Sequence, residues 1–434
     1  MPKVTLYNLG CSKNIVDGER ILYLFKRSGF SITDDASAAD TIVVNTCAFI
    51  REAQEEAIEM ILTAARAKAD ARTRLIVSGC FSERFRNEVA AQFPEVDLWV
   101  GVDDWTTVLG RLLETQAPSP FERVLSEPRA TQYLKIAEGC SHRCSFCVIP
   151  SIRGPFRSRS SASVIQEARW LESKGVRELI LVAQDSSRYG RDIGSSLAHL
   201  LEQLLASCTI PWIRIMYLHP QFVSRELLEL IAAEQRICSY FDIPLQHIAD
   251  PILSSMKRCP DATGIHRLIE RIRTTVPDAA IRSAFIVGYP GETETHFNEL
   301  LGFIEWARFD KLGVFPFSPE EGTPAHALRP RPRSATAQRR CETLMLAQRD
   351  ISRELNERRI GSRVEVIIDR TAEDPDFNFE ARTRYDAPEV DGKVLIRSGS
   401  FKPGTITEVS VIGSSDYDLF AETNPVRAAA AAIR

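Results

Sequence analysis

The chain has 434 residues, enough for two to four domains of ordinary size. Its composition, 44% hydrophobic and 26% charged, is typical of a globular protein, and no apolar run of about 18 residues indicates a membrane span. The net charge of −4 argues against a generally basic nucleic-acid-binding surface, although it leaves room for a local patch. Ten cysteines behind an N-terminus that does not look like a signal peptide indicate metal or redox chemistry in a reducing compartment, hence a cytoplasmic location.

The first 110 residues repeat one pattern three times: a short apolar strand, a cysteine, and an amphipathic helix. The predicted strands are Val4–Leu9, Thr41–Asn45 and Leu75–Ser78, and the cysteines that follow them are Cys11, Cys47 and Cys80. This alternation predicts a parallel α/β sheet, in which ligands bind beyond the carboxyl ends of the strands. The three thiols are therefore expected to meet at one edge of the sheet.

Two interpretations of these three cysteines are open at this point. Each could be a small buried residue at a strand end, because free cysteine is commonly buried. Alternatively, the three thiolates could hold an iron–sulfur cluster with one open iron, since cubanes normally take four cysteine ligands. The same topological position occurs three times, which favours the cluster.

Residues 114–132 are rich in Pro, Ser and Glu without clear periodicity and are predicted to be a linker. A strand at Tyr133–Ala137 then leads into a loop that carries Cys140, Cys144 and Cys147 at the spacing C-x3-C-x2-C. Three thiolates from one loop again leave an iron open for a substrate or cofactor. A zinc knuckle would need a fourth ligand, and His142 has an awkward spacing for it. A disulfide is disfavoured because nothing else in the chain looks secreted.

This cysteine loop resembles the signature of the radical S-adenosylmethionine (SAM) enzymes. The run from Val148 to Arg159 is similar to the methylthiotransferase branch of that superfamily. The resemblance implies that the open iron of a [4Fe-4S] cluster binds SAM and that SAM is cleaved to a deoxyadenosyl radical. It also implies a second, auxiliary [4Fe-4S] cluster on Cys11, Cys47 and Cys80, which carries the sulfur to be inserted.

Two N-terminal segments narrow the resemblance to the RimO-type family. They are Leu9–Asp17 and Val44–Ile50. The tRNA-modifying MiaB relatives usually have Gln-Met-Asn where this chain has Ser12-Lys13-Asn14. The RimO-type resemblance implies methylthiolation of the β-carbon of an aspartate in the small-subunit ribosomal protein S-twelve, with one SAM as methyl donor and a second as radical source.

Strands and helices alternate again through the central part of the chain, which predicts an open partial (β/α) barrel of six strands. Polar residues follow most of these strands, as expected for an active site at the carboxyl ends. Gln184 and Arg282 are predicted to hold polar groups of SAM, because a guanidinium group suits a carboxylate. The family resemblance places Phe146 near the adenine. Arg153, Arg157 and Arg159 either face the substrate or anchor the loop through carboxylates, and His247 is a structural hydrogen-bonder or a ligand.

From residue 360 the pattern changes to about five short strands, which predicts a small all-β barrel that resembles a TRAM domain. Residues 360–424 contain 7 Lys and Arg against 13 Asp and Glu, a net charge of −6. An acidic barrel should repel tRNA and attract a basic ribosomal protein. The other interpretation is that this charge only keeps the module in solution.

The sequence thus predicts four segments: 1–113 with the auxiliary cluster, linker 114–132, radical SAM domain with its trailing helix 133–359, and TRAM-like barrel 360–426. The expected partners are a basic ribosomal protein and an unidentified reductant, with tRNA disfavoured and no membrane involved. Two other functions stay open: a tRNA (adenosine) methylthiotransferase and a non-catalytic iron–sulfur electron carrier. The carrier would want four cysteines per cluster, and each set has three.

Overall fold

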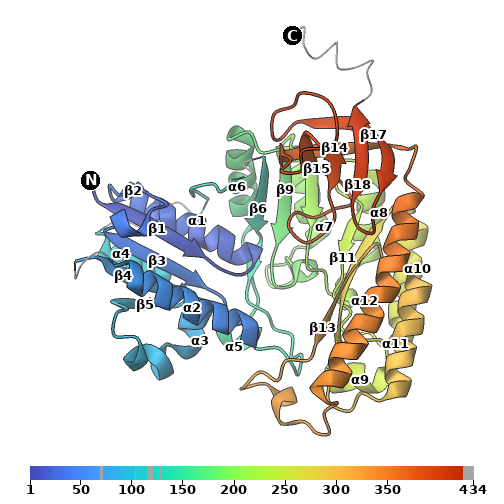
Figure 1. Cartoon of the computed structure of the whole chain (residues 1–434), viewed down its shortest axis with the longest axis horizontal. Coiled ribbons are helices and arrows are strands. Elements are labelled where there is room, and N and C mark those ends of the chain that lie inside the picture. Colours follow the sequence, from blue (N-terminus) through green and yellow to red (C-terminus); the bar gives the residue numbers. More distant parts are fainter. Residues whose placement is uncertain (69–71, 103, 115–120, 128–129, 424–434) are drawn as a thin grey trace.

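The computed structural model describes residues 1–68, 72–102, 104–114, 121–127 and 130–423. Figure 1 shows an N-terminal sheet domain in blue, a central body from green to orange, and a small barrel in red. Residues 115–120 and 128–129 of the predicted linker, and the last predicted segment beyond residue 423, lie outside the described residues. Among the described helices, none is long and apolar enough to cross a membrane.

The N-terminal domain is a five-stranded parallel sheet in the order β2-β1-β3-β4-β5, with helices on both faces. This confirms the predicted parallel α/β sheet. Its elements are β1 (Lys3–Asn8), α1 (Ser12–Arg27), β2 (Ser31–Ile32), β3 (Thr41–Thr46), α2 (Arg51–Ala67), β4 (Arg74–Gly79), α3 (Cys80–Val89), β5 (Leu98–Val100) and α4 (Trp105–Leu112).

The central strands of this sheet alternate their apolar side chains between two cores. Ile42 and Val44 of β3 pack with α2 and α3, whereas Val43 between them packs with α1 and α4. A parallel strand that is buried on both faces is a continuous β-branched run, and such runs made β1, β3 and β4 predictable. The two-residue β2 and three-residue β5 were not predicted, because they are too short to leave a pattern.

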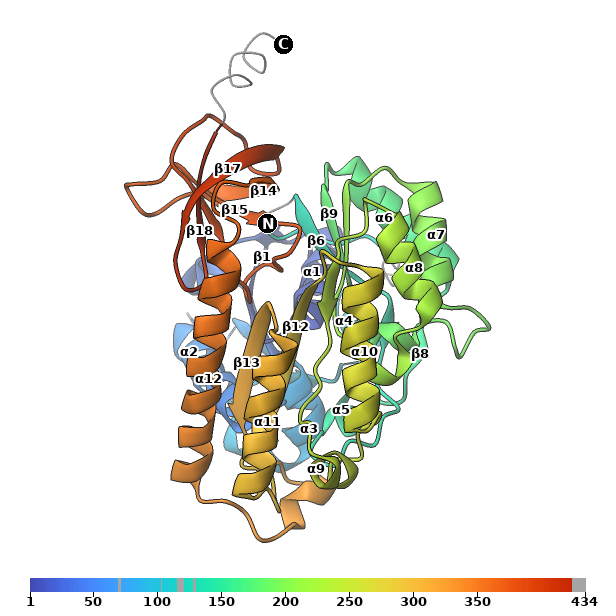
Figure 2. The same cartoon turned by 90° about the vertical axis from the view of Figure 1, so that its right-hand side faces the viewer.

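The central body is the predicted open partial barrel, with its helices on the outside (Figure 2). Its strands form two parallel groups, β6-β9-β10 and β11-β12-β13, and a parallel bridge between Ile213 and Ile237 links the groups. The elements are β6 (Thr131–Lys135), β7 (Ala137–Glu138), α5 (Ile149–Arg153), β8 (Arg157–Ser158), α6 (Ser161–Ser173), β9 (Glu178–Val182), α7 (Leu197–Ser207), β10 (Trp212–Ile215), α8 (Arg225–Ala233), β11 (Tyr240–Asp242), α9 (Asp250–Ser255), α10 (Ala262–Thr275), β12 (Ala280–Val287), α11 (Glu294–Ala307), β13 (Lys311–Pro316) and α12 (Ser334–Glu357).

The C-terminal part is a closed five-stranded barrel in the order β14-β15-β16-β18-β17, as predicted. Alternate residues of each strand, such as Val364, Val366 and Ile368, fill its core. The strands are β14 (Arg363–Thr371), β15 (Phe379–Thr383), β16 (Val394–Ile396), β17 (Ile406–Ser414) and β18 (Leu419–Thr423).

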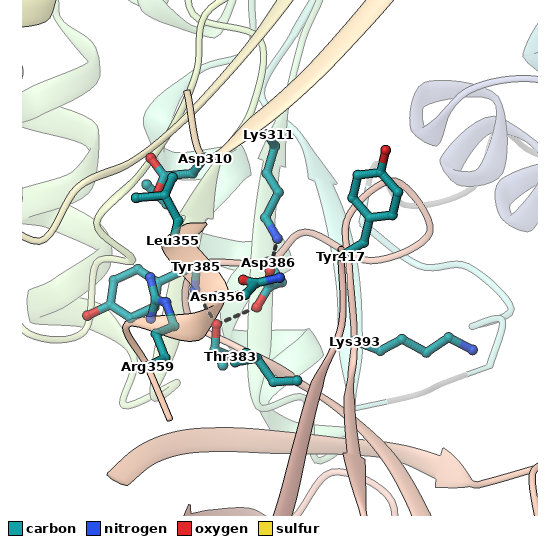
Figure 3. Close-up of a pocket in the computed structure, with 12 residues that line it drawn as sticks. Asp310, Lys311, Leu355, Asn356, Arg359, Thr383, Tyr385, Asp386, Lys393 and Tyr417 are labelled. Carbon is teal, nitrogen blue, oxygen red and sulfur yellow. Dashed lines mark hydrogen bonds and ion pairs between the residues drawn. The ribbon is translucent and has the colours of Figure 1, made fainter. Parts of the chain in front are cut away.

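The small barrel is docked on the interior of the partial barrel by apolar contacts and buried ion pairs. Ile367 of β14 packs in one cluster with Trp212 and Tyr240 of the central strands. Arg382 of β15 donates to Glu178 of β9 at 2.8 Å. Figure 3 shows a second contact, in which Lys311 of β13 points at Asp386 at 2.7 Å. These contacts join the small barrel to the central body.

Candidate functional site

The three N-terminal cysteines lie at the carboxyl ends of adjacent strands, as predicted. Cys11 precedes α1, Cys47 follows β3 directly, and Cys80 begins α3 after β4. The loops that carry Cys11 and Cys47 pack closely, so that a Cβ added to Gly10 would lie only 3.1 Å from the Cys47 sulfur. Gly10 also has a left-handed φ of +91°, which favours glycine. Asn14 fixes two of these loops by donating to the carbonyls of Leu9 and Thr46, each at 2.9 Å.

The electrostatic surroundings differ among the three thiols. Burial raises the pKa of Cys80 to about 11 and also raises the pKa of Cys47. Burial opposes ionisation of Cys11 too, but the charges of Lys13 and Arg153, with backbone N–H donors, bring its pKa below the usual value. The Arg153 charge acts on all three thiols, so they share one local field.

Arg153 comes from α5 of the central body and crosses to the N-terminal domain. It is 2% exposed, and it donates to Asn14 at 2.5 Å, to Asp17 at 3.3 Å and to Glu138 at 3.1 Å. Lys135 also contacts Asp17 and Glu138. Two cations and two carboxylates therefore form a balanced buried network between the domains. Of the two predicted roles of Arg153, the structure shows the carboxylate anchor.

Lys13 lies beside this network on the first turn of α1. Its ammonium is 3.7 Å from the centroid of the Tyr217 ring, and the Tyr217 hydroxyl is 3.5 Å from that of Ser12. Burial alone would lower the pKa of Lys13, but the proximity of Tyr217 and Cys11 raises it. Tyr217 follows β10, so this contact joins the auxiliary cysteines to the mouth of the partial barrel.

The loop with Cys140, Cys144 and Cys147 is fixed at both ends and in its middle. Gly139 needs to be glycine, because it has φ +75° and a Cβ there would lie 2.2 Å from the Pro155 carbonyl oxygen. The Cys140 N–H donates to the Gly154 carbonyl at 3.0 Å. At the centre of the loop, Ser145 contacts Tyr289 and the backbone of residues 255, 256 and 325.

Arg258 contacts this loop from outside it, and it was not among the residues predicted from the sequence. Its Nη1 donates to the Cys144 sulfur at 3.7 Å, and its Nη2 donates to the Pro244 carbonyl at 2.6 Å. Burial raises the pKa of Cys147 to about 12 and raises that of Cys140, while the charge of Arg258 opposes the shift at Cys147.

His142, inside the same loop, makes a hydrogen bond with Asp185 at 2.7 Å and stacks on His219 with 4.0 Å between the ring centroids.

The three predicted SAM contacts occupy different surroundings. Phe146 packs against Met256 and Tyr289 inside the central body. Gln184 donates to Glu138 at 2.8 Å, and its carbonyl oxygen is buried without a hydrogen-bond partner among the described residues. Arg282 pairs with Asp242 of β11 at 2.8 Å and with Asp391 of the small C-terminal barrel at 3.6 Å. Contact of these residues with SAM stays a prediction.

The other polar candidates have structural contacts. Arg159 pairs with the buried Glu167 at 2.6 Å, whereas Arg157 is exposed. His247 is fully buried, and its Nδ1 accepts from the Ala249 N–H at 3.0 Å. Burial lowers the pKa of His247 to about 3, so its ring is neutral. These contacts agree with the anchoring and structural alternatives for Arg159 and His247.

The donor sets suit iron–sulfur clusters. Each set supplies three thiols at one place, beside a buried arginine, Arg153 or Arg258, whose charge favours the thiolate form. Within the described residues, no group of three or more Cys, His, Asp and Glu is arranged to hold a single metal ion. The thiolates of a cubane bind different iron atoms, so they need not converge on one point.

Known proteins and families resemble this chain along nearly its whole length. Family models match at residues 3–101 (uncharacterized protein family UPF0004), 134–304 (radical SAM superfamily) and 360–423 (TRAM domain). The ribosomal protein uS12 methylthiotransferase RimO of Syntrophus aciditrophicus is 42% identical over 96% of this chain and 98% of that protein. The enzyme of that name from Geobacter sulfurreducens is also 42% identical, over 97% and 98%.

Among solved structures, the fold is similar to the radical SAM methyltransferase TsrM from Kitasatospora setae. The form with cobalamin and a [4Fe-4S] cluster bound has a TM-score of 0.53 at 16% identity, over 86% of this chain and 82% of that one. At this identity the likeness shows the fold alone. The full-length sequence matches and the three family models carry the assignment: the chain belongs to the RimO family of radical SAM methylthiotransferases.

Proposed function

We propose that the chain methylthiolates the β-carbon of an aspartate in ribosomal protein uS12, which is the small-subunit protein S-twelve. The observation that carries this proposal is the pair of three-cysteine sets, one on each side of a domain contact made by Arg153. When bound, two [4Fe-4S] clusters would supply the electron that cleaves one SAM and the sulfur that is methylated by another. The chain's own residues hold, orient and charge-balance these groups.

The residue roles follow from the two donor sets. Cys140, Cys144 and Cys147 would hold the radical SAM cluster, and Arg258 would donate to the Cys144 sulfur. The auxiliary cluster would be held by Cys11, Cys47 and Cys80 in the field of Arg153. Phe146, Gln184 and Arg282 remain proposed SAM contacts, of which Gln184 has a buried oxygen with no hydrogen-bond partner among the described residues.

The charge of the terminal barrel supports a basic protein as the substrate. Part of its acidity serves docking, because Asp386 and Asp391 face Lys311 and Arg282 of the central body. Other acidic residues are exposed, among them Glu373, Asp374 and Asp376 in the turn between β14 and β15. Exposed carboxylates repel phosphates and steer basic partners, which favours uS12 over tRNA.

The proposal keeps the predicted division of the chain into segments 1–113, 114–132, 133–359 and 360–426. Described residues of the linker segment contribute to the domain contact, because the buried Arg123 contacts Glu19 of α1 and Glu167 of α6. An unidentified reductant and a cytoplasmic location belong to the same proposal, since clusters with open irons need a reducing compartment.

Two cysteine substitutions test whether the two sets have different roles. Cys144→Ala should abolish SAM cleavage and leave about four of about eight irons after anaerobic reconstitution. Cys47→Ala should also leave about four irons, but deoxyadenosine should still form while methylthiolation is lost. Cys341→Ala on α12, outside both sets, is the matched control and should behave like the wild type. An electron carrier would instead show no SAM cleavage in any variant.

A further inference from the structure

We propose that Lys13, with the hydroxyls of Ser12 and Tyr217, forms the site that binds the side-chain carboxylate of the target aspartate. This inference rests on the proposed function, and it names the group of the substrate that the chain recognises. Three donors from two domains meet at this place: Ser12 and Lys13 come from the first turn of α1, and Tyr217 follows β10.

Lys13 differs from the cations of the neighbouring network, because its ammonium lies over the Tyr217 ring and not against a carboxylate of the described residues. The neighbouring network contains Lys135 and Arg153 against Asp17 and Glu138, and these four groups compensate one another. Lys13 is 8% exposed, yet its ammonium makes no ion pair or hydrogen bond with any residue in the described part of the chain. An ammonium that makes no ion pair can donate to an incoming anion, so an anionic group of the substrate would complete this site.

The backbone of Tyr217 is a second observation that indicates a functional site. Tyr217 has φ +62°, a left-handed conformation that is rare for a bulky residue. It is held there from both sides: its N–H donates to Asp242 at 3.1 Å, and its carbonyl accepts from the Ser186 N–H at 2.8 Å. Residues in such conformations cluster at active and binding sites. Here the conformation directs the ring over the Lys13 ammonium.

A carboxylate suits this site better than other anions because of the reaction that must take place beside it. The Lys13 charge acts on Cys11, one of the proposed ligands of the sulfur-carrying cluster. In aspartate the β-carbon is bonded directly to the carboxylate carbon. A carboxylate held by Lys13 would therefore present the β-carbon next to the sulfur donor, as positioning of the reacting atoms requires. An ammonium with two hydroxyls matches the acceptor oxygens of a carboxylate.

The competing explanation is that Lys13 only balances the charge of the auxiliary cluster. A double-mutant cycle separates the two, using full-length reconstituted enzyme and intact uS12 or its variant with asparagine at the target position. The enzyme variants are Lys13→Met and, as control, Lys26→Met, which removes an exposed lysine from the same helix. The readouts are the Kd of uS12 without SAM, the reduction potential of the auxiliary cluster, and the KM and kcat of methylthiolation.

We expect wild-type enzyme to bind uS12 about 10- to 100-fold more tightly than the asparagine variant. Lys13→Met should lose this preference with iron content unchanged, and the loss should appear in KM. The cluster potential should become more negative, because the variant lacks the positive charge that acts on Cys11. Lys26→Met should keep the preference.

A Lys13→Met enzyme that still prefers aspartate, with only its cluster potential shifted, would overturn the inference and make Lys13 a counter-ion of the cluster. Wild-type enzyme that modifies tRNA and never uS12 would overturn the proposed function, and the inference with it.

Discussion

At the scale of single residues, buried arginines define the site as much as the cysteines do. Arg153 reaches from α5 into the N-terminal domain, and Arg258 reaches from the loop after α9 to the cysteine loop. Guanidinium groups suit these positions because they stay charged when buried and donate in several directions at once. Each arginine brings positive charge to a place where the proposed clusters would need thiolates.

Arg153→Met should destabilise the folded protein by about 3–5 kcal/mol, because it leaves Asp17 and Glu138 buried with Lys135 as their remaining cation. Denaturant unfolding measures this change. Arg157→Met, at an exposed position of the same segment, should change the stability by less than about 0.5 kcal/mol. Equal effects of the two substitutions would contradict the role of Arg153 as the buried link between domains.

Arg258→Gln should make the radical SAM cluster harder to reduce, because the charge and the hydrogen bond to the Cys144 sulfur favour the reduced, more negative cluster. We expect a more negative potential in a redox titration and about a 10- to 100-fold loss of SAM cleavage. Arg258→Lys, which keeps the charge, should recover part of both. An unchanged potential would show that the contact with Cys144 has no electronic role.

At the scale of elements, α1 and the cysteine loop both depend on close backbone packing. The first turn of α1 carries donors toward the site, and its second turn carries Asp17 and Glu19 into the domain contact. The cysteine loop returns to the Gly154 backbone so closely that no side chain fits on Gly139. These two elements place the cysteine sets on either side of one contact.

Gly139→Ala should prevent the radical SAM cluster from assembling, because a methyl group there would meet the Pro155 carbonyl at 2.2 Å. Iron should fall from about eight to about four per chain, with the auxiliary set still loaded. Gly194→Ala is the matched control, since Gly194 has φ +70° but nothing within 4 Å of its added Cβ. If both variants load iron fully, the close packing at Gly139 is not required.

Elements and cysteine positions could be predicted from the sequence where a local pattern encodes them. The spacing of Cys11, Cys47 and Cys80 matches the length of one strand–helix crossover, so their meeting at a sheet edge followed from topology. The contact between Arg258 and Cys144 could not be predicted in this way, because 114 positions separate the two residues. The same holds for Tyr217 above Lys13, which depends on how two domains dock.

At the scale of the whole molecule, the terminal barrel is an integral part of the fold. Glu178 of β9 lies fully buried between Arg214 of β10 and Arg382 of β15, so one carboxylate links the barrel to two central strands. The acidic residues of the barrel have two surroundings: Asp386 and Asp391 pair with the central body, and others, such as Glu373, face solvent. The net charge seen in the sequence did not distinguish these surroundings.

The pH dependence of stability should reveal the docking carboxylate. Burial would raise the pKa of Glu178, but Arg382 and Arg214 lower it to about 2 from its ordinary value of 4.5. Because the folded state favours the carboxylate, this stabilisation is present above about pH 4.5 and is lost as the pH falls through about 2. It should amount to about 3 kcal/mol in unfolding measured between about pH 5 and about pH 2.

Glu178→Gln supplies the comparison for this pH dependence. The variant should be less stable at neutral pH, because Arg214 and Arg382 lose their shared partner, and its stability should fall less steeply in acid. Parallel curves for the variant and the wild type would show that another group causes the acid sensitivity.

The mass of uS12 after reaction tests the central claim most directly. Reconstituted full-length enzyme is incubated without oxygen with SAM, a reductant, and unmodified uS12 or unmodified tRNA. We predict that uS12 gains one sulfur and one CH2 unit on a single aspartate, and that tRNA is unchanged. The same gain on tRNA, with uS12 unchanged, would contradict both the assignment of the substrate and the interpretation of the acidic barrel.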